Sequence, residues 1–317
     1  MTGRRRLVIL TEGDAVRGLG HVVRCSAYAE GWQERGGEVQ WVVDGDDRAA
    51  ALAAVTGAVH RQAWQEGASL RLTVQDVVLV DSYALTQAAA DRIGASAGPV
   101  VVIDDLGSIA WPGALVVRPA GVGDEVEMAG PRWQPLRAAF REAPARETVS
   151  EAVDQVLVIL GGTDVRGLSD RMVGVVRRVW PQARIDVLGS ALPGPRLTAH
   201  RDCDAGAVAR LMARADVAVS AAGQAVFELA RCGTPSVIVQ VAANQAPSMT
   251  LWPVLAGFEA AGGWDDPDLD DRVEVALRRL APADRRLSMA RRAQAAVDGR
   301  GVDRVLDRLD QTDPTLR

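Results

Sequence analysis

Short apolar runs rich in β-branched residues alternate with longer alanine-rich segments along the chain. Such short runs are typical of buried parallel strands, and the longer segments between them are typical of helices. In the first half, the pattern predicts strands at 7–12, 39–44, 76–82 and 99–105 and helices at 20–35, 46–56 and 86–96. This alternation predicts a doubly wound α/β sheet.

The alternation stops at 141–152, REAPARETVSEA, which is polar, contains a proline and has no apolar periodicity. Strands are predicted again at 155–162, 184–189, 216–221 and 235–240. The tail from 284 predicts one or two amphipathic helices around a glycine break. We therefore expect an α/β protein with two Rossmann-like doubly wound domains. They are assigned to 1–143 and 154–317 with a linker at 144–153, and the terminal helices can pack back on the N-terminal domain.

The composition is that of a soluble globular protein, with 48% hydrophobic and 24% charged residues. All basic residues are arginines, and the net charge of -5 argues against a nucleic-acid partner. Cys25, Cys203 and Cys232 are scattered without metal-binding spacing, which favours a reduced, cytoplasmic location. The early run LVIL is too short for a signal-peptide core, and no run is long enough for a membrane span.

Ligands of open α/β sheets bind beyond the carboxyl ends of the strands, so the segments that follow the predicted strands are the candidate sites. In the first half these are RGLGH, DSYAL and DDLG; in the second they are GGTD, SAAGQAVFELA and QVAANQ. Their glycines allow a close approach of backbone to a ligand.

In SAAGQAVFELA, a strand ends in small residues and a helix begins at about Gly223 or Gln224. The free N–H groups and the dipole of a helix start suit a diphosphate. Glu228 follows at roughly 7 Å along the helix axis, where it could accept ribose hydroxyls. The alternative is a solvated or structural glutamate on an ordinary strand–helix unit.

RGLGHVVRCSAYA begins like a dinucleotide fingerprint, but Val23 stands where the third glycine belongs. His21 opens the predicted helix instead. A neutral imidazole, with an ordinary pKa of about 6.5, is a competent general base, and a helix start disfavours its protonation. The alternative is a capping or packed histidine. Arg24, one turn later, is expected to brace the helix.

Two acidic stretches resemble metal-binding motifs, Asp44-Gly45-Asp46-Asp47 and Asp104-Asp105. The first is better explained as a strand end followed by a helix cap. We expect no metal ion and no cofactor.

Taken together, GLGHVVR, VDSYA, IDDLG, LGGTD, SAAGQAVFELARCGTPSVIV, NQ and VDGRGVDRV occur in an order that resembles one family. The chain resembles the PseG-type nucleotide-sugar hydrolases of the pseudaminic acid pathway and the related SpsG-like proteins. The resemblance spans nearly the whole chain and includes GPRWQPLRAAF at 130–140. It implies a glycosyltransferase-B-like fold with the active site in an interdomain cleft and with UDP held mainly by the C-terminal domain.

The resemblance also implies roles for individual residues. His21 would activate the water that attacks the anomeric carbon with inversion, while UDP departs. The residues implied for the nucleotide are Gly161, Gly162, Ala222, Gly223, Gln224 and Glu228. Those implied for the sugar side are Gly20, Asp81, Tyr83, Asp105, Asn244 and Gln245. Tyr83 has an equally good alternative in interdomain packing, and the alternative for Asp105 is that it simply fixes its loop.

The chain departs from the family near the expected sugar pocket. The Arg-x-Asp pattern common at the end of the first strand is replaced by Leu10-Thr11-Glu12, which keeps the carboxylate but loses the arginine. Gln224 stands where small hydroxyl residues are common, and Trp133 where a tyrosine is frequent. The sugar can therefore differ from the pseudaminic acid precursor.

The favoured hypothesis is inverting hydrolysis of a UDP-linked amino deoxy sugar of the 2,4-diacetamido type. A glycosyltransferase of the same fold is the alternative, because water leaves no motif. A non-catalytic nucleotide-sugar-binding subunit is disfavoured by the presence of His21 and Glu228. The expected partner is a small-molecule nucleotide sugar, and the expected state is a monomer or weak homo-oligomer.

Overall fold

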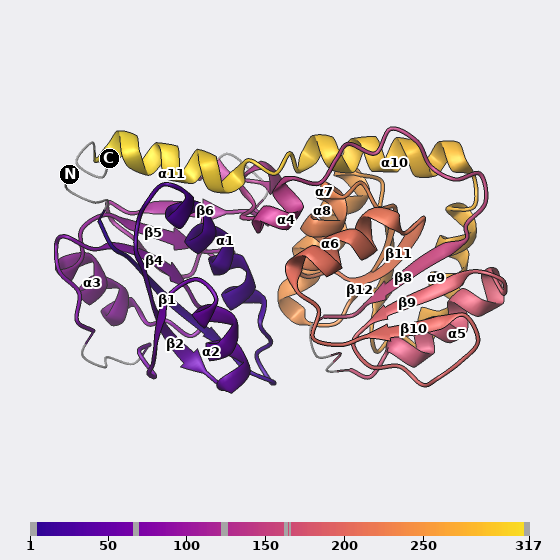
Figure 1. Cartoon of the computed structure of the whole chain (residues 1–317), viewed down its shortest axis with the longest axis horizontal. Coiled ribbons are helices and arrows are strands. Elements are labelled where there is room, and N and C mark those ends of the chain that lie inside the picture. The colour runs from indigo at the N-terminus through magenta and orange to yellow at the C-terminus, as the bar shows by residue number, and fades with distance from the viewer. Residues whose placement is uncertain (1–4, 66–69, 122–125, 162–163, 165, 314–317) are drawn as a thin grey trace. The chain divides into compact units, whose positions relative to one another are not determined.

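The computed structural model describes residues 5–65, 70–121, 126–161, 164 and 166–313. The chain forms two compact units, coloured along the sequence in Figure 1. Unit 1 comprises Met1–Ala138 together with Gly299–Arg317, and unit 2 comprises Ala139–Asp298. The chain therefore leaves unit 1 and returns to it at its C-terminal end.

Unit 1 contains a seven-stranded sheet with the order β3-β2-β1-β4-β5-β6-β7, and its paired strands are parallel. Its strands are β1 (Leu7–Gly13), β2 (Val39–Gly45), β3 (Ala58–Arg61), β4 (Val77–Asp81), β5 (Val100–Ile103), β6 (Leu115–Arg118) and β7 (Met128–Ala129). Its helices are α1 (Gly20–Glu34), α2 (Asp47–Ala54), α3 (Gln87–Ser96), η1 (Pro131–Trp133) and α11 (Gly301–Thr312).

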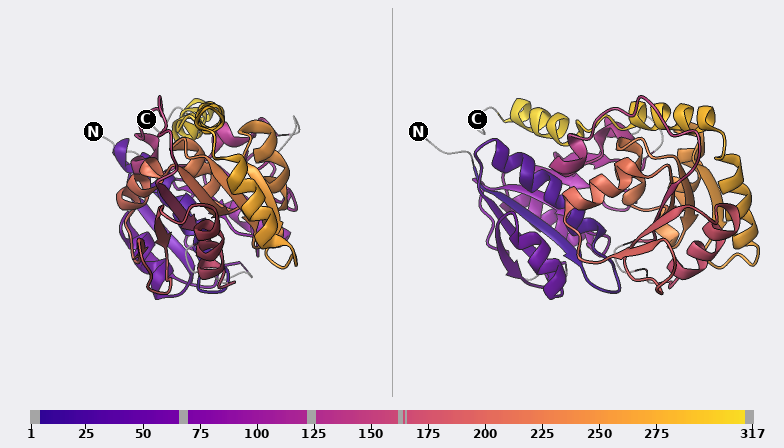
Figure 2. Two further views of the ribbon diagram at one scale, coloured as in Figure 1. Left: turned by 90° about the vertical axis from the view of Figure 1, so that its right-hand side faces the viewer. Right: turned by 45° about the vertical axis from the view of Figure 1, so that its right-hand side comes forward.

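Successive residues of β1 point to opposite faces of this sheet, which gives unit 1 two apolar layers. Leu7 and Ile9 pack with buried side chains of α1, α2 and α11. Val8 and Leu10 pack with Ile93 of α3 on the other face. The central strands are apolar on both faces because both are covered by helices, as Figures 1 and 2 show.

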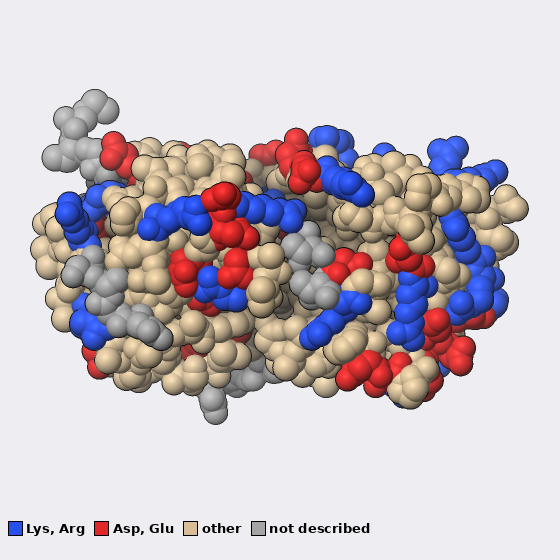
Figure 3. Space-filling view, turned by 90° about the horizontal axis from the view of Figure 1, so that it is seen from below, with Lys and Arg blue, Asp and Glu red and all other residues tan. Residues whose placement is uncertain are grey.

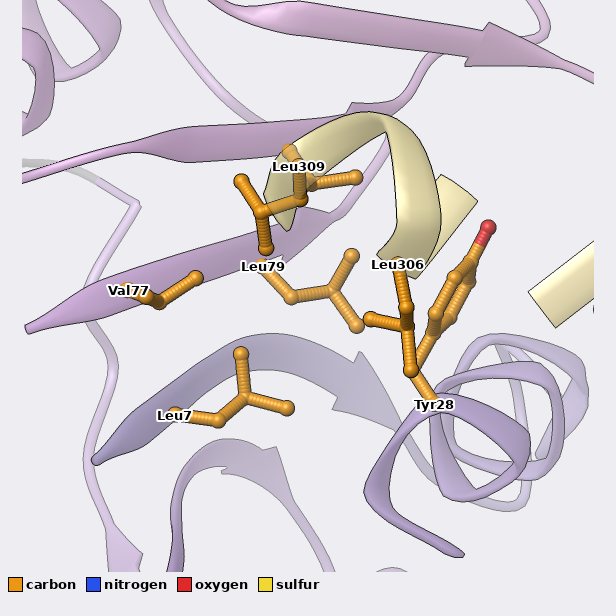
Figure 4. A pocket seen from close by; sticks show the side chains of 7 residues that line it. Leu7, Tyr28, Val77, Leu79, Leu306 and Leu309 are labelled. Atoms are coloured by element: carbon orange, nitrogen blue, oxygen red, sulfur yellow. The ribbon is translucent and has the colours of Figure 1, made fainter. Parts of the chain in front are cut away.

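The helix that returns from unit 2, α11, packs closely against α1. A Cβ atom added to Gly31 would lie 2.6 Å from a methyl carbon of Val302, so only glycine fits there without a shift. A small apolar cavity remains beneath these helices, and in Figure 4 the Tyr28 hydroxyl points away from its aliphatic lining. The lining residues are Leu7, Tyr28, Val77, Leu79, Val101, Leu306 and Leu309. We interpret the cavity as a packing gap of the core.

Unit 2 contains a six-stranded sheet with the order β10-β9-β8-β11-β12-β13, again with parallel pairs. Its strands are β8 (Gln155–Ile159), β9 (Arg184–Leu188), β10 (Leu197–His200), β11 (Val217–Ala221), β12 (Ser236–Gln240) and β13 (Glu259–Gly263). Its helices are α5 (Ser169–Val179), α6 (Ala205–Arg214), α7 (Ala225–Arg231), η2 (Ala243–Gln245), α8 (Ala246–Leu255), α9 (Leu269–Arg279) and α10 (Ala283–Ala296). The short helix α4 (Ala138–Arg141) lies at the boundary between the units. Helix α5 packs on α9, and α7 packs on α6 and α10.

The eight strands and three N-terminal helices predicted from the pattern are all present, with ends shifted by only a few residues. The pattern missed β3, β6, β7, β10 and β13. The tail forms two helices, of which α10 belongs to unit 2 and α11 to unit 1. The expected linker 144–153 lies within unit 2, where the buried Arg286 donates hydrogen bonds to the carbonyls of Ser150 and Glu151.

Charged side chains of both signs are interspersed on the face shown in Figure 3. Within the described ranges, no helix is both long enough and apolar enough to cross a membrane.

Candidate functional site

Each sheet has a topological switch point, where the strand order reverses beside its first strand. In unit 1 it lies between β1 and β4, because β2 pairs with the other side of β1. In unit 2 it lies between β8 and β11, because β9 pairs with the other side of β8. Loops at such points diverge to opposite faces and leave space for a ligand. Most of the predicted site residues follow these strands, whereas Asp105 follows β5 and the pair Asn244 and Gln245 follows β12.

His21 is the second residue of α1, which follows β1 after a short turn. Gly18 has a φ of 82° in this turn, a conformation that favours glycine. The His21 Nδ1 atom lies 3.7 Å from Asp81 Oδ1 and 3.8 Å from Glu12 Oε1. This nitrogen is buried and has no hydrogen-bond partner among the described residues. The ring also contacts Tyr83 edge-on, with centroids 4.3 Å apart and planes at 82°.

Burial lowers the pKa of His21, and the positive charge of Arg24 lowers it as well. The carboxylates of Asp81, Glu12 and Asp105 act in the opposite direction, but the net pKa lies below the ordinary histidine value. The ring is therefore neutral at pH 7, the form in which it can accept a proton.

Arg24, one helical turn after His21, ties the strand ends together. It is buried, its Nε and Nη2 atoms donate to the two oxygens of Asp81 at 2.5 and 2.6 Å, and its Nη1 donates to Asp105 at 2.5 Å. The Tyr83 hydroxyl donates to the same Asp105 oxygen at 3.2 Å. Burial raises the pKa of Asp105, but the charge and hydrogen bond of Arg24 and the hydrogen bond of Tyr83 lower it by more. The net pKa lies below the ordinary aspartate value, so this carboxyl stays ionised. Arg24 thus braces the helix, as expected.

Glu12 is buried at the end of β1 and orders the loop after β4. Its Oε2 accepts from the Ser82 hydroxyl at 2.8 Å and from the Gln65 amide at 2.7 Å. Its Oε1 accepts from the Tyr83 N–H at 3.1 Å. Arg17 adds a contact of 3.5 Å to Glu12 and a closer ion pair with Asp44.

The structure thus brings together four of the residues predicted for the sugar and the base: His21, Asp81, Tyr83 and Asp105. Tyr83 is exposed, and so is Gly20, which precedes His21 in the chain. Asp81, in contrast, has no exposed surface, and both its oxygens are occupied by Arg24. Its carboxylate therefore accepts hydrogen bonds from Arg24 and lies beside the His21 ring.

The remaining predicted residues lie in unit 2. Ala222 and Gly223 follow β11, Gln224 precedes α7, and Glu228 lies buried within α7. Gln245 of η2 lies over this turn, because a Cβ added to Gly223 would be 3.2 Å from its Nε2. Its Oε1 accepts from the Val241 N–H at 2.9 Å. Asn244, beside it, is exposed.

Gly161 follows β8 in an exposed position with a φ of 94°, which favours glycine. The predicted Gly162 lies outside the described residues. Asp164 caps α5, since its two oxygens accept from the N–H groups of Leu168 and Ser169 at 3.0 and 2.9 Å.

Sequence reasoning missed Arg166 and Trp264, whose side chains stack at the same end of the sheet. The signal available for Arg166 was its place two residues after GGTD.

The two acidic stretches serve local structure. Asp46 accepts from the Ala49 N–H at 2.9 Å, so the predicted helix cap is confirmed. Asp104 accepts from the N–H groups of Leu106 and Gly107 at 3.2 and 2.7 Å. No cluster of three or more metal-ligating His, Cys, Asp or Glu residues was found in the part of the chain that is described.

Comparison with known proteins finds a relative by sequence and several solved structures with the same fold. No family model matches the chain. It is 25% identical over 334 residues to the spore coat polysaccharide biosynthesis protein SpsG of Bacillus subtilis (strain 168), covering 94% of this chain and 95% of SpsG. The predicted resemblance to SpsG-like proteins is therefore confirmed.

Solved structures match across nearly the whole chain. MurG of Acinetobacter baumannii has a TM-score of 0.65 at 15% identity, covering 97% of this chain and 99% of MurG. MnaA of S. aureus, solved with UDP, has a TM-score of 0.63 at 11% identity, covering 97% of this chain and 96% of MnaA. The protein has the α/β fold with two parallel-sheet domains of glycosyltransferase-B enzymes, and this prediction is confirmed.

Proposed function

We propose that the protein hydrolyses a UDP-linked amino deoxy sugar with inversion, releasing free sugar and UDP, and that His21 is the general base. The observation that carries the proposal is the His21 site, where a ring kept neutral by burial lies beside two buried carboxylates. Similarity to SpsG, a polysaccharide biosynthesis protein, supports a carbohydrate substrate. The UDP bound to a structural neighbour supports the nucleotide.

In the proposed mechanism, the His21 Nε2 atom removes a proton from water as the water oxygen bonds to the anomeric carbon. The bond from that carbon to the phosphate oxygen breaks, and its electron pair leaves with UDP. The imidazolium that forms has its Nδ1 atom 3.7 and 3.8 Å from Asp81 and Glu12. These carboxylates stabilise the new positive charge at the moment it appears. Asp81 is therefore assigned a positioning role instead of the predicted sugar contact.

The roles of the other residues are assigned from the strand ends that they follow. We assign Gly20, Tyr83 and Asp105 to the sugar and Asn244 and Gln245 to the sugar and phosphate side. The nucleotide is assigned to Gly161, Ala222, Gly223, Gln224 and Glu228, which line the switch point of the unit 2 sheet or follow it in α7. UDP is a good leaving group, so the mechanism needs neither a general acid nor a metal ion.

The test is incubation with UDP-linked amino deoxy sugars in the absence of any acceptor. Stoichiometric UDP and free sugar of inverted anomeric configuration, followed by NMR before mutarotation, are expected. The variant His21→Ala should turn over about 100- to 10,000-fold more slowly, the usual contribution of a general base. Its UDP affinity should be unchanged. Normal turnover by this variant would remove His21 from the mechanism.

Glycosyl transfer to an acceptor hydroxyl is the second candidate, favoured by the glycosyltransferase-B fold itself. It needs the same base and the same leaving group, and differs only in what replaces water. Release of UDP only after an acceptor is added would establish transfer and exclude hydrolysis.

A further inference from the structure

In unit 2, two contacts fix the orientation of the Arg166 guanidinium. Its Nε donates to the Val241 carbonyl at 3.2 Å, and its central carbon lies 4.2 Å from the centroid of the Trp264 ring. The backbone of Trp264 is itself held, because its main-chain N–H donates to the Gln240 carbonyl at 2.8 Å. A guanidinium that is stacked on an indole and hydrogen-bonded along one edge loses little further entropy when it binds a ligand.

The position of Arg166 relates it to the proposed nucleotide site. It follows β8, while its partners Val241 and Trp264 follow β12 and β13. Because β11 lies between β8 and β12 in the sheet, the hydrogen bond from Arg166 to Val241 joins residues that follow the two strands on either side of β11. Gly223 follows β11 itself. Val241 connects the two directly, since its N–H is bound by Gln245, the residue that lies over Gly223.

The charge of Arg166 has no acidic partner in the part of the chain that is described. No carboxylate there forms an ion pair with its guanidinium, whereas the buried Arg24 of unit 1 has two acidic partners. The chain contains no lysine, so a side-chain cation for a phosphate must come from arginine or histidine. With Nε bound to Val241, the two Nη groups remain to donate to an anion.

We propose that Arg166 binds the diphosphate of the nucleotide sugar through its Nη groups, with Trp264 as the residue that positions it. The inference rests on the proposed function and adds a cation to the backbone groups assigned above. Paired N–H donors of arginine match phosphate oxygens in geometry and charge. A fixed positive charge there also stabilises the additional negative charge that the phosphate gains when the bond to the sugar breaks.

The test is calorimetric titration of the full chain with UDP, UMP and uridine. Arg166→Ala should weaken UDP binding about 10- to 100-fold, the effect of losing charge-assisted hydrogen bonds, and leave uridine binding unchanged. Trp264→Leu should weaken UDP binding by a smaller factor, and Trp264→Phe should restore most of it, because the phenyl ring preserves the stacking face. A purely structural tryptophan would instead change UDP and uridine binding together.

The matched control is Arg177→Ala. Arg177 is also an arginine of unit 2 that donates to a carbonyl, that of Pro195, and UDP affinity should not change on its removal. Unchanged UDP affinity in Arg166→Ala, or an equal loss of uridine affinity, would overturn the inference. If the unaltered protein binds none of the three probes and turns over no UDP-sugar, the proposed function itself fails. The two failures are therefore distinguishable.

Discussion

At the residue scale, burial and charge compete to set the protonation of His21. Burial lowers its pKa and the three nearby carboxylates raise it, with burial prevailing. Protonation of a neutral buried group favours the unfolded state, in which the ordinary pKa of about 6.5 applies. The contribution of His21 to stability is therefore complete above that pH and is lost as the pH falls below it.

The same shift predicts the pH profile of the reaction. If His21 is the base, kcat/KM should be constant around neutral pH and fall only below the ordinary histidine pKa of about 6.5. Replacing Glu12 with glutamine removes one carboxylate that raises the pKa, so the acid limb of the profile should move to lower pH. Profiles of kcat/KM for both proteins measure this. An acid limb that stays in place, or moves to higher pH, would contradict the assignment.

Arg24 should be important for stability because it neutralises two carboxylates in a buried place. Replacing it with methionine leaves Asp81 and Asp105 without their cation, which should lower the free energy of unfolding by about 3–5 kcal/mol. Arg24→Lys keeps the charge but cannot span both carboxylates with the same fork, so its loss should be smaller. Urea unfolding measures both variants, and a loss in Arg24→Met within about 1 kcal/mol would mean that the two acids protonate or rearrange at little cost.

Sequence reasoning identified residues whose chemistry follows from local position. His21 opens a helix after a glycine turn, and Asp81 and Asp105 end or follow neighbouring strands, so the topology alone brings them to one edge. It could not foresee that both Asp81 oxygens would be occupied by Arg24, because that depends on side-chain packing across the sheet. It missed Arg166 for the same reason, since Trp264 is 98 positions away in the chain.

At the element scale, the pattern identified the central strands and missed strands at or beside the edges. Central strands such as β1 and β8 are covered on both faces and appear as continuous apolar runs. Edge strands need less apolar surface: β3 is largely exposed, β7 has two residues, and β13 contains two glycines. Strand β6, next to the edge, is only partly buried.

Two helical glycines, one in the contact between α1 and α11 and one in open space on α3, should respond in opposite ways to substitution by alanine. Gly31→Ala should destabilise the protein by about 1–3 kcal/mol, because its methyl group overlaps Val302. The control is Gly94→Ala in α3, where nothing lies within 4 Å and where alanine should stabilise the helix by about 0.5–1 kcal/mol.

A second change identifies the cause of the Gly31 effect. If the overlap with Val302 is responsible, Val302→Ala should be less costly in the Gly31→Ala background than in the unaltered protein, a coupling that a double-mutant cycle measures. Additive effects would show that the two helices do not meet as closely as this contact requires.

At the scale of the whole molecule, the last helix of the chain, α11, belongs to unit 1 together with the N-terminal residues. The buried partners of α11 are residues of unit 1, among them Leu7, Tyr28 and Leu79. The amphipathic tail could be predicted from its periodicity. The sequence also allowed the terminal helices to pack back on the N-terminal domain. Which of the two helices does so could not be predicted, because the choice depends on Gly31 leaving space on α1 and on Gly301 lying against the Gln134 backbone.

Because α11 belongs to unit 1, a substitution in α11 should lower the stability of unit 1 without changing nucleotide binding by unit 2. Leu306→Ala removes a buried side chain of α11 and should cost about 2–5 kcal/mol, seen as faster hydrogen exchange in the strands of unit 1. UDP affinity, assigned to unit 2, should not change. The mirror variant Leu277→Ala, in the core of unit 2, should instead accelerate exchange in β11–β13 and reduce the protection that UDP provides there. If Leu306→Ala weakened UDP binding as strongly as it loosened unit 1, the nucleotide would depend on unit 1, and the assignment of UDP to unit 2 alone would be wrong.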